Sequence, residues 1–347
     1  MTNQPGYLLY SPGELVLVTG ASGTIGPSLI QKLVELDFRI RVYSRDALRY
    51  GQLNHKVEVI QGDIRDIDAL RRAMAGVRYV FHLAAKLHIY NPTVEDTLEY
   101  QQVNVEGTRN VVLSALEENV TRLVFFSTIN VYGPGESGIV FTEQSALKPR
   151  TIYSKTKVKA EKIIMEKMIS KEGESQAVIL RLAAVYGPQM KGNYLLLLRG
   201  LRDHWFVPIG KGNNRRTIIN IMDVVNGAVL AAFHPQAGGK IYNLTDGNIY
   251  SLKRIIEVMC KALNRKAPSI HLPIAPARFI AGLMEDMLKI FNKRSPLNRR
   301  LVNTIVEDRA VSGDLIQAEL NFSPGVTIEE GWSEIAESLG MINSQVG

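Results

Sequence analysis

Apolar runs alternate with helix-length segments through the first half of the chain, and this alternation constrains the fold more than any other feature. Because two strands joined through a helix run parallel in one sheet, the pattern predicts an α/β fold with a doubly wound parallel sheet. The expected strands are ELVLVTG (14–20), FRIRVYS (38–44), KVEVIQGD (56–63), VRYVFHLAA (77–85), TRLVFFST (121–128) and AVILRLAAVYG (177–187). Helical spacing marks PSLIQKLVELD (27–37), a long segment around 96–118 and SKTKVKAEKIIMEKMIS (154–170).

Beyond the last of these strands the alternation loosens. Glycine, asparagine and basic residues mix over 188–216, KIYNLTD (240–246) reads as one more strand, and most of the remaining chain reads as helical with proline breaks. This pattern is typical of a main domain with a smaller lobe inserted into it and appended to it. We expect the main domain at 11–187, joined again by segments around 217–246, and the lobe at 188–216 and 247–340.

Composition narrows the classes of function. The net charge of +7 over 347 residues suits an anionic ligand, but no long basic block or basic–aromatic pattern predicts a nucleic-acid partner. Cys260 is the single cysteine, which excludes an intrachain disulfide and a cysteine-rich zinc site, and no metal is predicted. The first residues, MTNQPGYLLYSPGE, lack the apolar core of a signal peptide, and no apolar run approaches the roughly 18 residues of a bilayer span. We therefore expect a cytoplasmic protein.

One segment of the lobe carries an apolar stripe at helical spacing, followed by four basic residues. Such a stripe suits either packing onto the main domain or docking on a membrane surface, and we expect the packing. The stripe consists of Phe279, Ile280, Leu283, Met284, Met287, Leu288 and Phe291, and the basic residues are Lys293, Arg294, Arg299 and Arg300.

A glycine-rich segment, VTGASGTIG (18–26), connects the first expected strand to the first expected helix. Gly20 permits a tight turn, and glycine at positions 23 and 26 lets a pyrophosphate approach the backbone without meeting a Cβ atom. The amino terminus of the helix then offers free N–H groups and the positive end of its dipole. The segment therefore predicts a dinucleotide site.

A resemblance to a known superfamily extends over nearly the whole chain. The motifs are TGASGTIG (19–26), QGDIRD (61–66), HLAA (82–85), VNVEGTRN (103–110), STINVYG (127–133), YSKTK (153–157), RLAAVYGP (181–188) and GKGNNRRTIINIMDV (210–224). Together they resemble the extended short-chain dehydrogenases/reductases, and within them the NAD-dependent epimerase/dehydratase family. The resemblance implies a Rossmann-type sheet with a smaller, mostly helical substrate lobe.

The resemblance also implies an NAD or NADP cofactor and its contacts. The residues that it places at the cofactor are Gly20, Gly23, Thr24, Ile25, Gly26, Ser44, Arg45, Asp63, Ile64, Leu83, Ala84, Ala85, Asn104, Tyr153 and Lys157. Asp63 and Ile64 would flank the adenine, and Ala84 and Ala85 would lie on the nicotinamide side. His82, on a core strand, is expected to be a packed histidine and not a catalyst.

Tyr153 and Lys157 stand four residues apart on one face of a helix. An ammonium next to a phenol favours the phenolate, so Tyr153 could exchange a proton with a substrate hydroxyl or carbonyl. By the resemblance Thr128 supplies the catalytic hydroxyl that holds the substrate oxygen, with Ser127 as the near alternative. Where related dehydratases have an Asp-Glu pair, this chain has Ile129 and Asn130, so dehydration is not expected.

On the substrate side, Asn193 and Arg216 match positions that hold the pyrophosphate of a nucleotide sugar in the resembled family, with Arg215 as a rival for Arg216. A guanidinium grips phosphate oxygens as a fork, which suits a diphosphate. One departure is Ala184, three residues after Arg181, where many sugar epimerases have asparagine.

Cofactor choice depends on Ser44 and Arg45, which end the second expected strand where NAD-preferring relatives usually carry an acid. Both side chains could donate to a 2′-phosphate, so the pair favours NADP slightly over NAD. An exposed arginine beside Asp46 is the alternative interpretation.

The leading hypothesis is an NAD(P)-dependent enzyme acting at C4 of a nucleotide sugar, of the kind used for bacterial surface polysaccharides, as a 4-epimerase or a 4-ketoreductase. A hydroxysteroid- or dihydroflavonol-type reductase shares the same catalytic residues and is the second hypothesis. A dinucleotide-sensing regulator is the third, although it would not need Tyr153 and Lys157. The resemblance further implies a homodimer.

Overall fold

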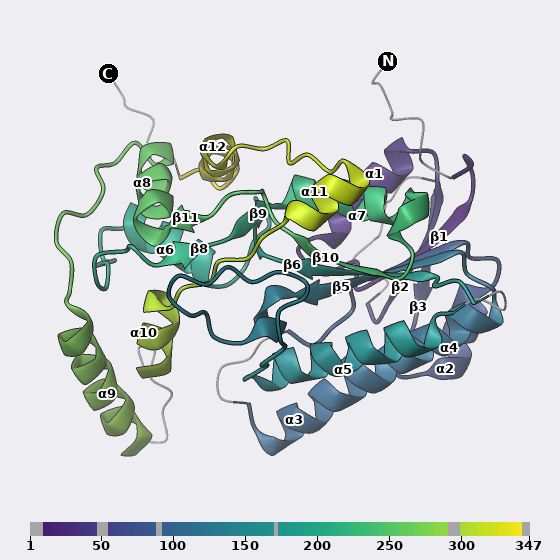
Figure 1. Cartoon of the computed structure of the whole chain (residues 1–347), viewed down its shortest axis with the longest axis horizontal. Helices are drawn as coiled ribbons and strands as arrows, with labels where there is room; N and C mark the ends of the chain where they lie inside the picture. The colour runs from purple at the N-terminus through teal and green to yellow at the C-terminus, as the bar shows by residue number, and fades with distance from the viewer. Residues whose placement is uncertain (1–9, 47–54, 88–91, 170–172, 291–298, 342–347) are drawn as a thin grey trace.

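The structure is a computed structural model that describes residues 10–46, 55–87, 92–169, 173–290 and 299–341. Its main feature is a seven-stranded parallel sheet of order β10-β6-β5-β4-β1-β2-β3 (Figure 1). The predicted α/β class with a doubly wound parallel sheet is thereby confirmed. The strands are β1 (Leu15–Thr19), β2 (Arg39–Ser44), β3 (Val57–Gln61), β4 (Tyr79–His82), β5 (Arg122–Thr128), β6 (Ala177–Leu182) and β10 (Lys240–Leu244).

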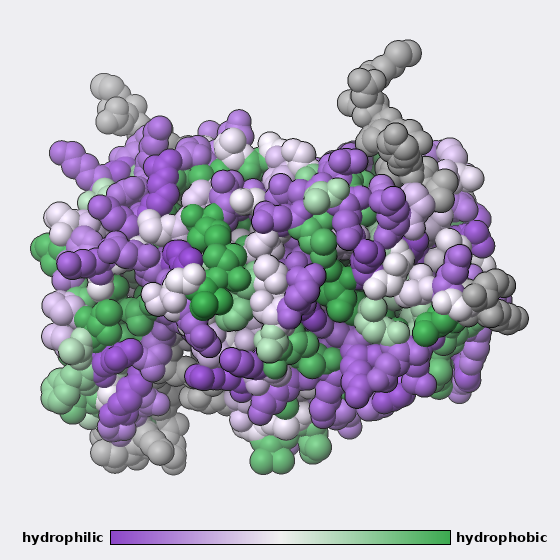
Figure 2. Space-filling model, in the orientation of Figure 1, coloured by the Kyte–Doolittle hydropathy of each residue, from purple (hydrophilic) through white to green (hydrophobic). Residues whose placement is uncertain are grey.

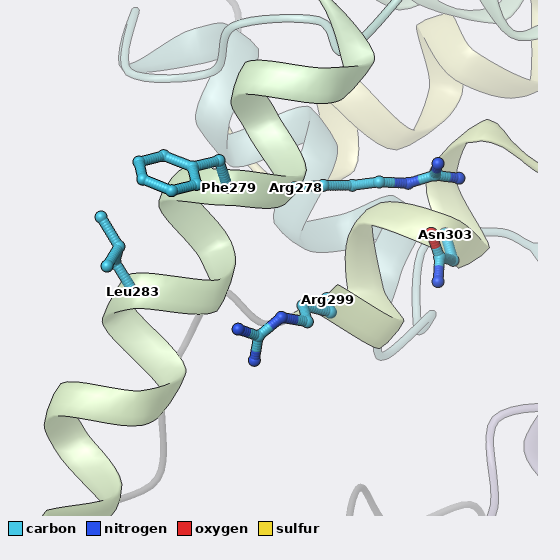
Figure 3. Close-up of a pocket in the computed structure, with 5 residues that line it drawn as sticks. All are labelled: Arg278, Phe279, Leu283, Arg299 and Asn303. Carbon is cyan, nitrogen blue, oxygen red and sulfur yellow. The ribbon is translucent and has the colours of Figure 1, made fainter.

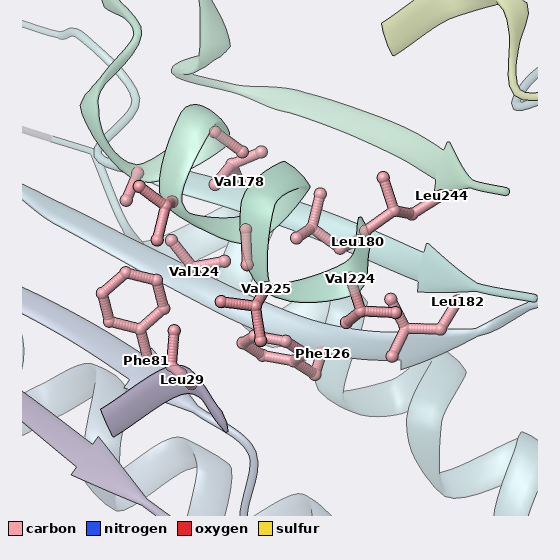
Figure 4. Close-up of a cluster of buried hydrophobic side chains, with 14 of the residues drawn as sticks. Leu29, Phe81, Val124, Phe126, Val178, Leu180, Leu182, Val224, Val225 and Leu244 are labelled. Carbon is pink, nitrogen blue, oxygen red and sulfur yellow. The ribbon is translucent and has the colours of Figure 1, made fainter. Parts of the chain in front are cut away.

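Helices cover both faces of this sheet, because the central strands β1, β4 and β6 are buried on both sides and need two covering layers. One layer holds α1 (Gly26–Glu35), α7 (Ile221–Phe233) and α11 (Asp314–Leu320), and the other holds α2 (Ile67–Met74), α4 (Gly107–Glu117) and α5 (Ile152–Lys167) (Figure 1). Figure 4 shows how side chains of β5, β6 and α7 interdigitate, among them Val124, Leu180 and Val225, all fully buried.

The order of the strands places a switch point between β1 and β4. The chain winds from β1 through β2 to β3 in one direction, then returns to β4 and continues through β5 and β6 in the other. In open α/β sheets, ligands bind beyond the carboxyl ends of the strands where the winding reverses. The glycine-rich segment after β1 and the Leu83–Ala85 segment after β4 both lie there.

Two expected elements differ in detail. The helix expected around 96–118 consists of α3 (Val94–Gln101), a π-helical turn at Gln102–Glu106, and α4. The strand expected at 177–187 divides into β6 and β7 (Ala184–Tyr186). The second part leaves the main sheet to pair with β9 (Ile218–Asn220), far along the chain.

The lobe has a core of its own around the buried indole of Trp332. Its helices are α6 (Asn193–Arg202), α8 (Leu252–Ala262) and α12 (Ile328–Ser338), and a two-stranded ribbon joins β8 (Arg215–Arg216) to β11 (Tyr250–Ser251). A further pair, α9 (Ile274–Ile290) and α10 (Arg299–Val306), lies at one end of the molecule (Figure 1).

The expectation that the apolar stripe packs onto the main domain is wrong. Helix α9 contacts α10, and its buried side chains are the small Ala277 and Ala281. Large members of the stripe are exposed: Phe279 by 68%, Leu283 by 50% and Met287 by 61%. Phe291, Lys293 and Arg294 lie outside the described residues.

Candidate active site

The glycine-rich segment forms a cradle that no larger residue would fit. Gly20 has a φ of +71°, and a Cβ atom on it would lie 2.4 Å from the backbone nitrogen of Ala84. A Cβ atom on Gly26 would lie 2.0 Å from the carbonyl oxygen of Ala21. Helix α1 begins next to this cradle with no side chain capping its first turn, so its free N–H groups suit a pyrophosphate. Thr24 and Ile25 are partly buried residues of the same turn.

The adenosine end lies beyond β2 and β3. Ile64 is buried against Gly107, whose Cβ position lies 2.6 Å from an Ile64 methyl group, so that side chain can form an apolar wall. Burial alone would raise the pKa of the Asp63 carboxyl, but two hydrogen bonds from the Arg65 guanidinium, at 2.7 and 3.0 Å, hold it below its usual value. Asp63 is thus charged and already paired.

Ser44 and Arg45 differ in their availability to a phosphate. The Ser44 side chain is buried, and its hydroxyl accepts a hydrogen bond from the Asp46 N–H at 3.3 Å. The Arg45 side chain is exposed and forms no ion pair with any described residue. Of the two residues, Arg45 has the side chain that could reach a 2′-phosphate.

His82 is a structural residue, as expected for a histidine of a core strand. Its two ring nitrogens lie 2.7 Å from the Thr19 hydroxyl and 3.0 Å from the Thr108 hydroxyl. Burial, with the Lys157 ammonium as the second cause, lowers the pKa of His82 to about 3, so the ring is neutral. The His82 ring therefore connects β4 to β1, through Thr19, and to α4, through Thr108.

Asn104 fixes the segment that follows β4. Its side-chain oxygen accepts a hydrogen bond from the Lys86 N–H at 2.7 Å, and its amide donates to the Lys86 carbonyl at 3.1 Å. The same amide donates to the Thr156 hydroxyl at 3.1 Å. Asn104, in the π-helical turn, thus joins Lys86, the residue after the Leu83–Ala85 segment, to helix α5.

Tyr153 and Lys157 lie on α5, whose first turn is closed by a capping box between Thr151 and Ser154. Burial lowers the pKa of Lys157 to about 7, against the opposing charge of Glu161, and its ammonium lies 4.1 Å from the centre of the Phe125 ring. Burial also raises the pKa of Tyr153 to about 12. This differs from the expectation that the lysine favours the phenolate, because burial disfavours the charged form of both groups.

Thr128 and Ser127 end β5 and point to opposite faces of the sheet. The Thr128 hydroxyl accepts a hydrogen bond from the Asn130 N–H at 3.2 Å, so its own proton remains available to a substrate oxygen. Ser127, the near alternative, is hydrogen-bonded to the buried Glu161 carboxylate. The geometry favours Thr128 as the catalytic hydroxyl.

Beneath α5 lies an ion pair that the sequence reasoning missed. Glu161 and Arg181 are 3–5% exposed, with a guanidinium nitrogen 2.7 Å from the carboxylate, and Arg181 also donates to the Tyr132 hydroxyl at 3.0 Å. The pair joins α5 to β6, and through Ser127 to β5. Glu161 follows Lys157 by one helical turn, and this spacing is the sequence feature that could have predicted a buried partner for Arg181.

Arg216 and Arg309 lie side by side, because their backbones form a parallel bridge. Arg216 donates two hydrogen bonds of 2.7 Å to the carbonyls of Thr304 and Ile305, near the end of α10. The Nε of Arg309 is buried and has no acceptor among the described residues. Arg309 also donates to the Glu307 carboxylate at 3.4 Å, but with its Nε free the two adjacent guanidiniums could bind an anion.

Asn193 lies at the first turn of α6, next to Tyr194, whose phenol is close to both guanidiniums. Burial raises the pKa of that phenol, while Arg216 and Arg309 oppose the rise. Asn193 precedes Tyr194 in the chain, and its role at a diphosphate stays a prediction. Arg215, the rival of Arg216, is instead paired with Asp308 at 3.0 Å.

Asn130 connects the arginine pair to the catalytic hydroxyl. Its side-chain oxygen accepts a hydrogen bond of 2.7 Å from Arg309, while its N–H donates to Thr128. Arg309 was missed because nothing near it in sequence relates it to Arg216 or to Thr128. The described residues contain no cluster of three or more His, Cys, Asp or Glu side chains that could hold a metal ion.

Sequence comparison finds two relatives that are named as 4-epimerases. The chain is 32% identical to the N-acetyl-α-D-glucosaminyl-diphospho-ditrans,octacis-undecaprenol 4-epimerase of Escherichia coli O157:H7, over 80% of this chain and 81% of that protein. It is 26% identical to the UDP-glucose 4-epimerase of Vibrio cholerae, over 95% and 97%.

Solved structures show the same fold. The UDP-glucuronic acid 4-epimerase from Bacillus cereus, in complex with NAD, superposes with a TM-score of 0.73 at 20% identity, over 95% of this chain and all of the other. MoeE5, in complex with UDP-glucuronic acid and NAD, gives 0.71 at 23% identity, over 94% and 98%. The model of the NAD dependent epimerase/dehydratase family matches residues 16–245. This protein is therefore an NAD-dependent enzyme of the short-chain dehydrogenase/reductase type, and the chain belongs to the NAD dependent epimerase/dehydratase family.

Proposed function

We infer that this protein interconverts the two configurations at C4 of a sugar that is linked to a diphosphate. The observation that carries the proposal is the continuous contact from Thr128 through Asn130 to Arg309 and Arg216, which joins a proton-transfer site to an anion site. The relatives from Escherichia coli and Vibrio cholerae are named for 4-epimerisation of two substrates that share a sugar diphosphate.

In the proposed reaction NAD, when bound, accepts the C4 hydrogen as hydride and returns it. Tyr153 would accept the proton of the C4 hydroxyl as the hydride leaves, which gives a 4-keto sugar; because burial raises the pKa of Tyr153 to about 12 in the protein alone, this step requires the phenol to be ionised first in the bound state. Thr128 donates a hydrogen bond to the same oxygen, and Lys157 holds its ammonium one turn from the phenol. Rotation of the 4-keto sugar would present its opposite face to the returning hydride, and Tyr153 would return the proton to the oxygen, which gives the epimer with no net oxidation.

The diphosphate would bind the arginine pair and the amino terminus of α6, where Asn193 lies. The guanidiniums of Arg216 and Arg309 supply forked donors, and the free N–H groups of the helix add to them. What the diphosphate is attached to is open between a nucleoside, as the sequence motifs predict, and a polyprenol, as in the Escherichia coli relative.

The test is to incubate the purified protein with UDP-N-acetylglucosamine, UDP-glucose or a short polyprenyl-diphospho-N-acetylglucosamine, without added reductant. We expect the C4 epimer, identified by NMR, and its loss in the Tyr153→Phe variant. A ketoreductase would instead consume NADH or NADPH in proportion to an added 4-keto sugar. Turnover of a sterol or flavonol that is insensitive to Arg216→Ala would contradict the proposal.

NADP use is a separate part of the proposal, carried by the exposed Arg45. We expect Arg45→Ala to raise the KM for NADP about tenfold and to change that for NAD less than twofold, because the loss of one charged hydrogen bond costs about 1.5 kcal/mol or more. Equal changes for both cofactors would show that Arg45 does not contact the 2′-phosphate.

A further inference from the structure

Helix α9 has the reverse of an ordinary packing pattern. The side chains that it buries against Val302 of α10 are those of Ala277 and Ala281, while large apolar side chains point outward. A surface helix normally buries its large apolar residues, and a contiguous exposed set marks an interaction site. The exposed large apolar residues of α9 are Ile274 (38%), Phe279 (68%), Ile280 (42%), Leu283 (50%) and Met287 (61%).

The outward residues form one face. Phe279, Leu283 and Met287 follow each other at intervals of four, and Ile280 stands three residues before Leu283, so all four share one side of the helix. Figure 2 shows hydrophobic surface at the corner of the molecule where Figure 1 places α9. We call Phe279, Ile280, Leu283 and Met287 the α9 face.

The sequences of α9 and α10 carry more basic than acidic residues. The two carboxylates of α9, Glu285 and Asp286, share one guanidinium, that of Arg299, at 3.6 and 2.8 Å. Arg278 is exposed and forms no ion pair with any described side chain. These four charges sum to zero, and Lys289 and Arg300 bring the net charge of the two helices to +2.

Between α9 and α10 lies a surface hollow of about 530 Å³, lined by Arg278, Phe279, Leu283, Arg299 and Asn303 (Figure 3). In this view Arg278 points toward Asn303, and Phe279 and Leu283 point to the other side of α9. Arg278 thus lies on the polar side of α9, opposite the apolar face, which is the arrangement of a helix that lies in the plane of a membrane interface.

We propose that α9 docks on the surface of an anionic phospholipid bilayer. The α9 face would enter the boundary between headgroups and acyl chains, with the helix parallel to the surface and Arg278 at the phosphate level. The charge of the whole chain, +7, acts in the same direction. The sequence that follows α9 is also basic, with Lys293 and Arg294, although these residues lie outside the described part and are not counted in the α9 face.

Docking of this kind is attachment to one leaflet. Among the described residues, no helix has the length and apolar character that a bilayer crossing needs. The proposal does not depend on which sugar the active site accepts, so the two are tested in separate assays.

The test is flotation of the full-length protein with vesicles of equal parts phosphatidylglycerol and phosphatidylcholine, and with pure phosphatidylcholine. We expect binding to the anionic vesicles that weakens as salt rises. Phe279→Ser with Leu283→Ser should reduce the partition coefficient at least tenfold, because two large side chains leave the apolar phase. Arg278→Gln should reduce it about fivefold, the contribution of one basic residue near an anionic surface.

The matched control is Leu147→Ser with Ile169→Ser, which removes two exposed apolar side chains, 37% and 44% exposed, outside the α9 face. The control variant should bind vesicles like the unmodified chain, and all variants should keep their activity on a soluble UDP-sugar. Absence of vesicle binding by the unmodified chain would overturn the proposal. So would α9 variants that change a dimer to monomers while vesicle binding is unaltered, since the face would then be a contact between subunits.

Discussion

At the scale of single residues, Lys157 shows that a functional group can weaken the fold that holds it. Its side chain is 2% exposed, and burial lowers its pKa from the ordinary 10.5 to about 7. Each unit of this shift corresponds to about 1.4 kcal/mol that disfavours the charged folded form. A lysine is retained at such a position when its charge has a use there.

Lys157→Met should therefore stabilise the protein at neutral pH while reducing its activity. Between pH 7 and 10.5 the unfolded chain binds more protons at Lys157 than the folded chain does, so the free energy of unfolding of the unmodified protein rises with pH across this window. The variant lacks this rise. Urea unfolding at several pH values measures the difference, and parallel curves for both proteins would contradict the assignment.

At the scale of elements, the Glu161–Arg181 pair holds α5 against the sheet. Both side chains are buried, so removal of one charge leaves the other without compensation. We expect Glu161→Gln to lower the free energy of unfolding by about 3 kcal/mol or more. Because α5 also carries Tyr153 and Lys157, kcat should fall as well.

A double variant separates charge from packing at this pair. Glu161→Leu combined with Arg181→Met removes both charges and keeps apolar volume, and should recover most of the stability that Glu161→Gln loses. Chemical unfolding of the three proteins measures this. A double variant less stable than the single one would show that Ser127 and Tyr132 depend on these charges for their own positions.

The elements also show how far the sequence could predict this structure. Each strand of the main sheet was predictable, because its apolar run and its flanking helix are local signals. The division of 177–187 was not, since β7 leaves the sheet to pair with β9, a partner remote in sequence. The outward face of α9 was not either, because an apolar stripe specifies an amphipathic helix and not what covers it.

The residues of the candidate site also differ in whether the sequence could predict them. The glycine-rich segment and the Tyr153–Lys157 spacing are local patterns; the structure places the first at the switch point of the sheet and the second on α5, with Lys157 over the Phe125 ring of β5. Arg309 could not be predicted, because its relation to Arg216 and Asn130 exists only once the lobe closes against the sheet.

At the scale of the whole molecule, the resemblance predicts a homodimer formed by the helices that precede β5 and by α5. Helix α3 is one of the helices that precede β5, and its Val94 and Leu98 side chains are 78% and 59% exposed. We expect light scattering after gel filtration to give twice the mass of the chain, and Val94→Glu with Leu98→Glu to give a monomer. A monomeric unmodified protein would contradict the prediction.

Asn130 connects the binding of the diphosphate to the position of the catalytic hydroxyl. It joins Arg309 to Thr128, so a group gripped far from the sugar also positions the hydroxyl next to the reacting carbon. Binding energy from the diphosphate end of the substrate would then raise the rate of reaction at C4, in addition to making the substrate bind more tightly. A sugar monophosphate should react with a lower kcat as well as a higher KM than the sugar diphosphate substrate. In the Asn130→Ala variant the kcat values of the intact and the truncated substrate should be more nearly equal.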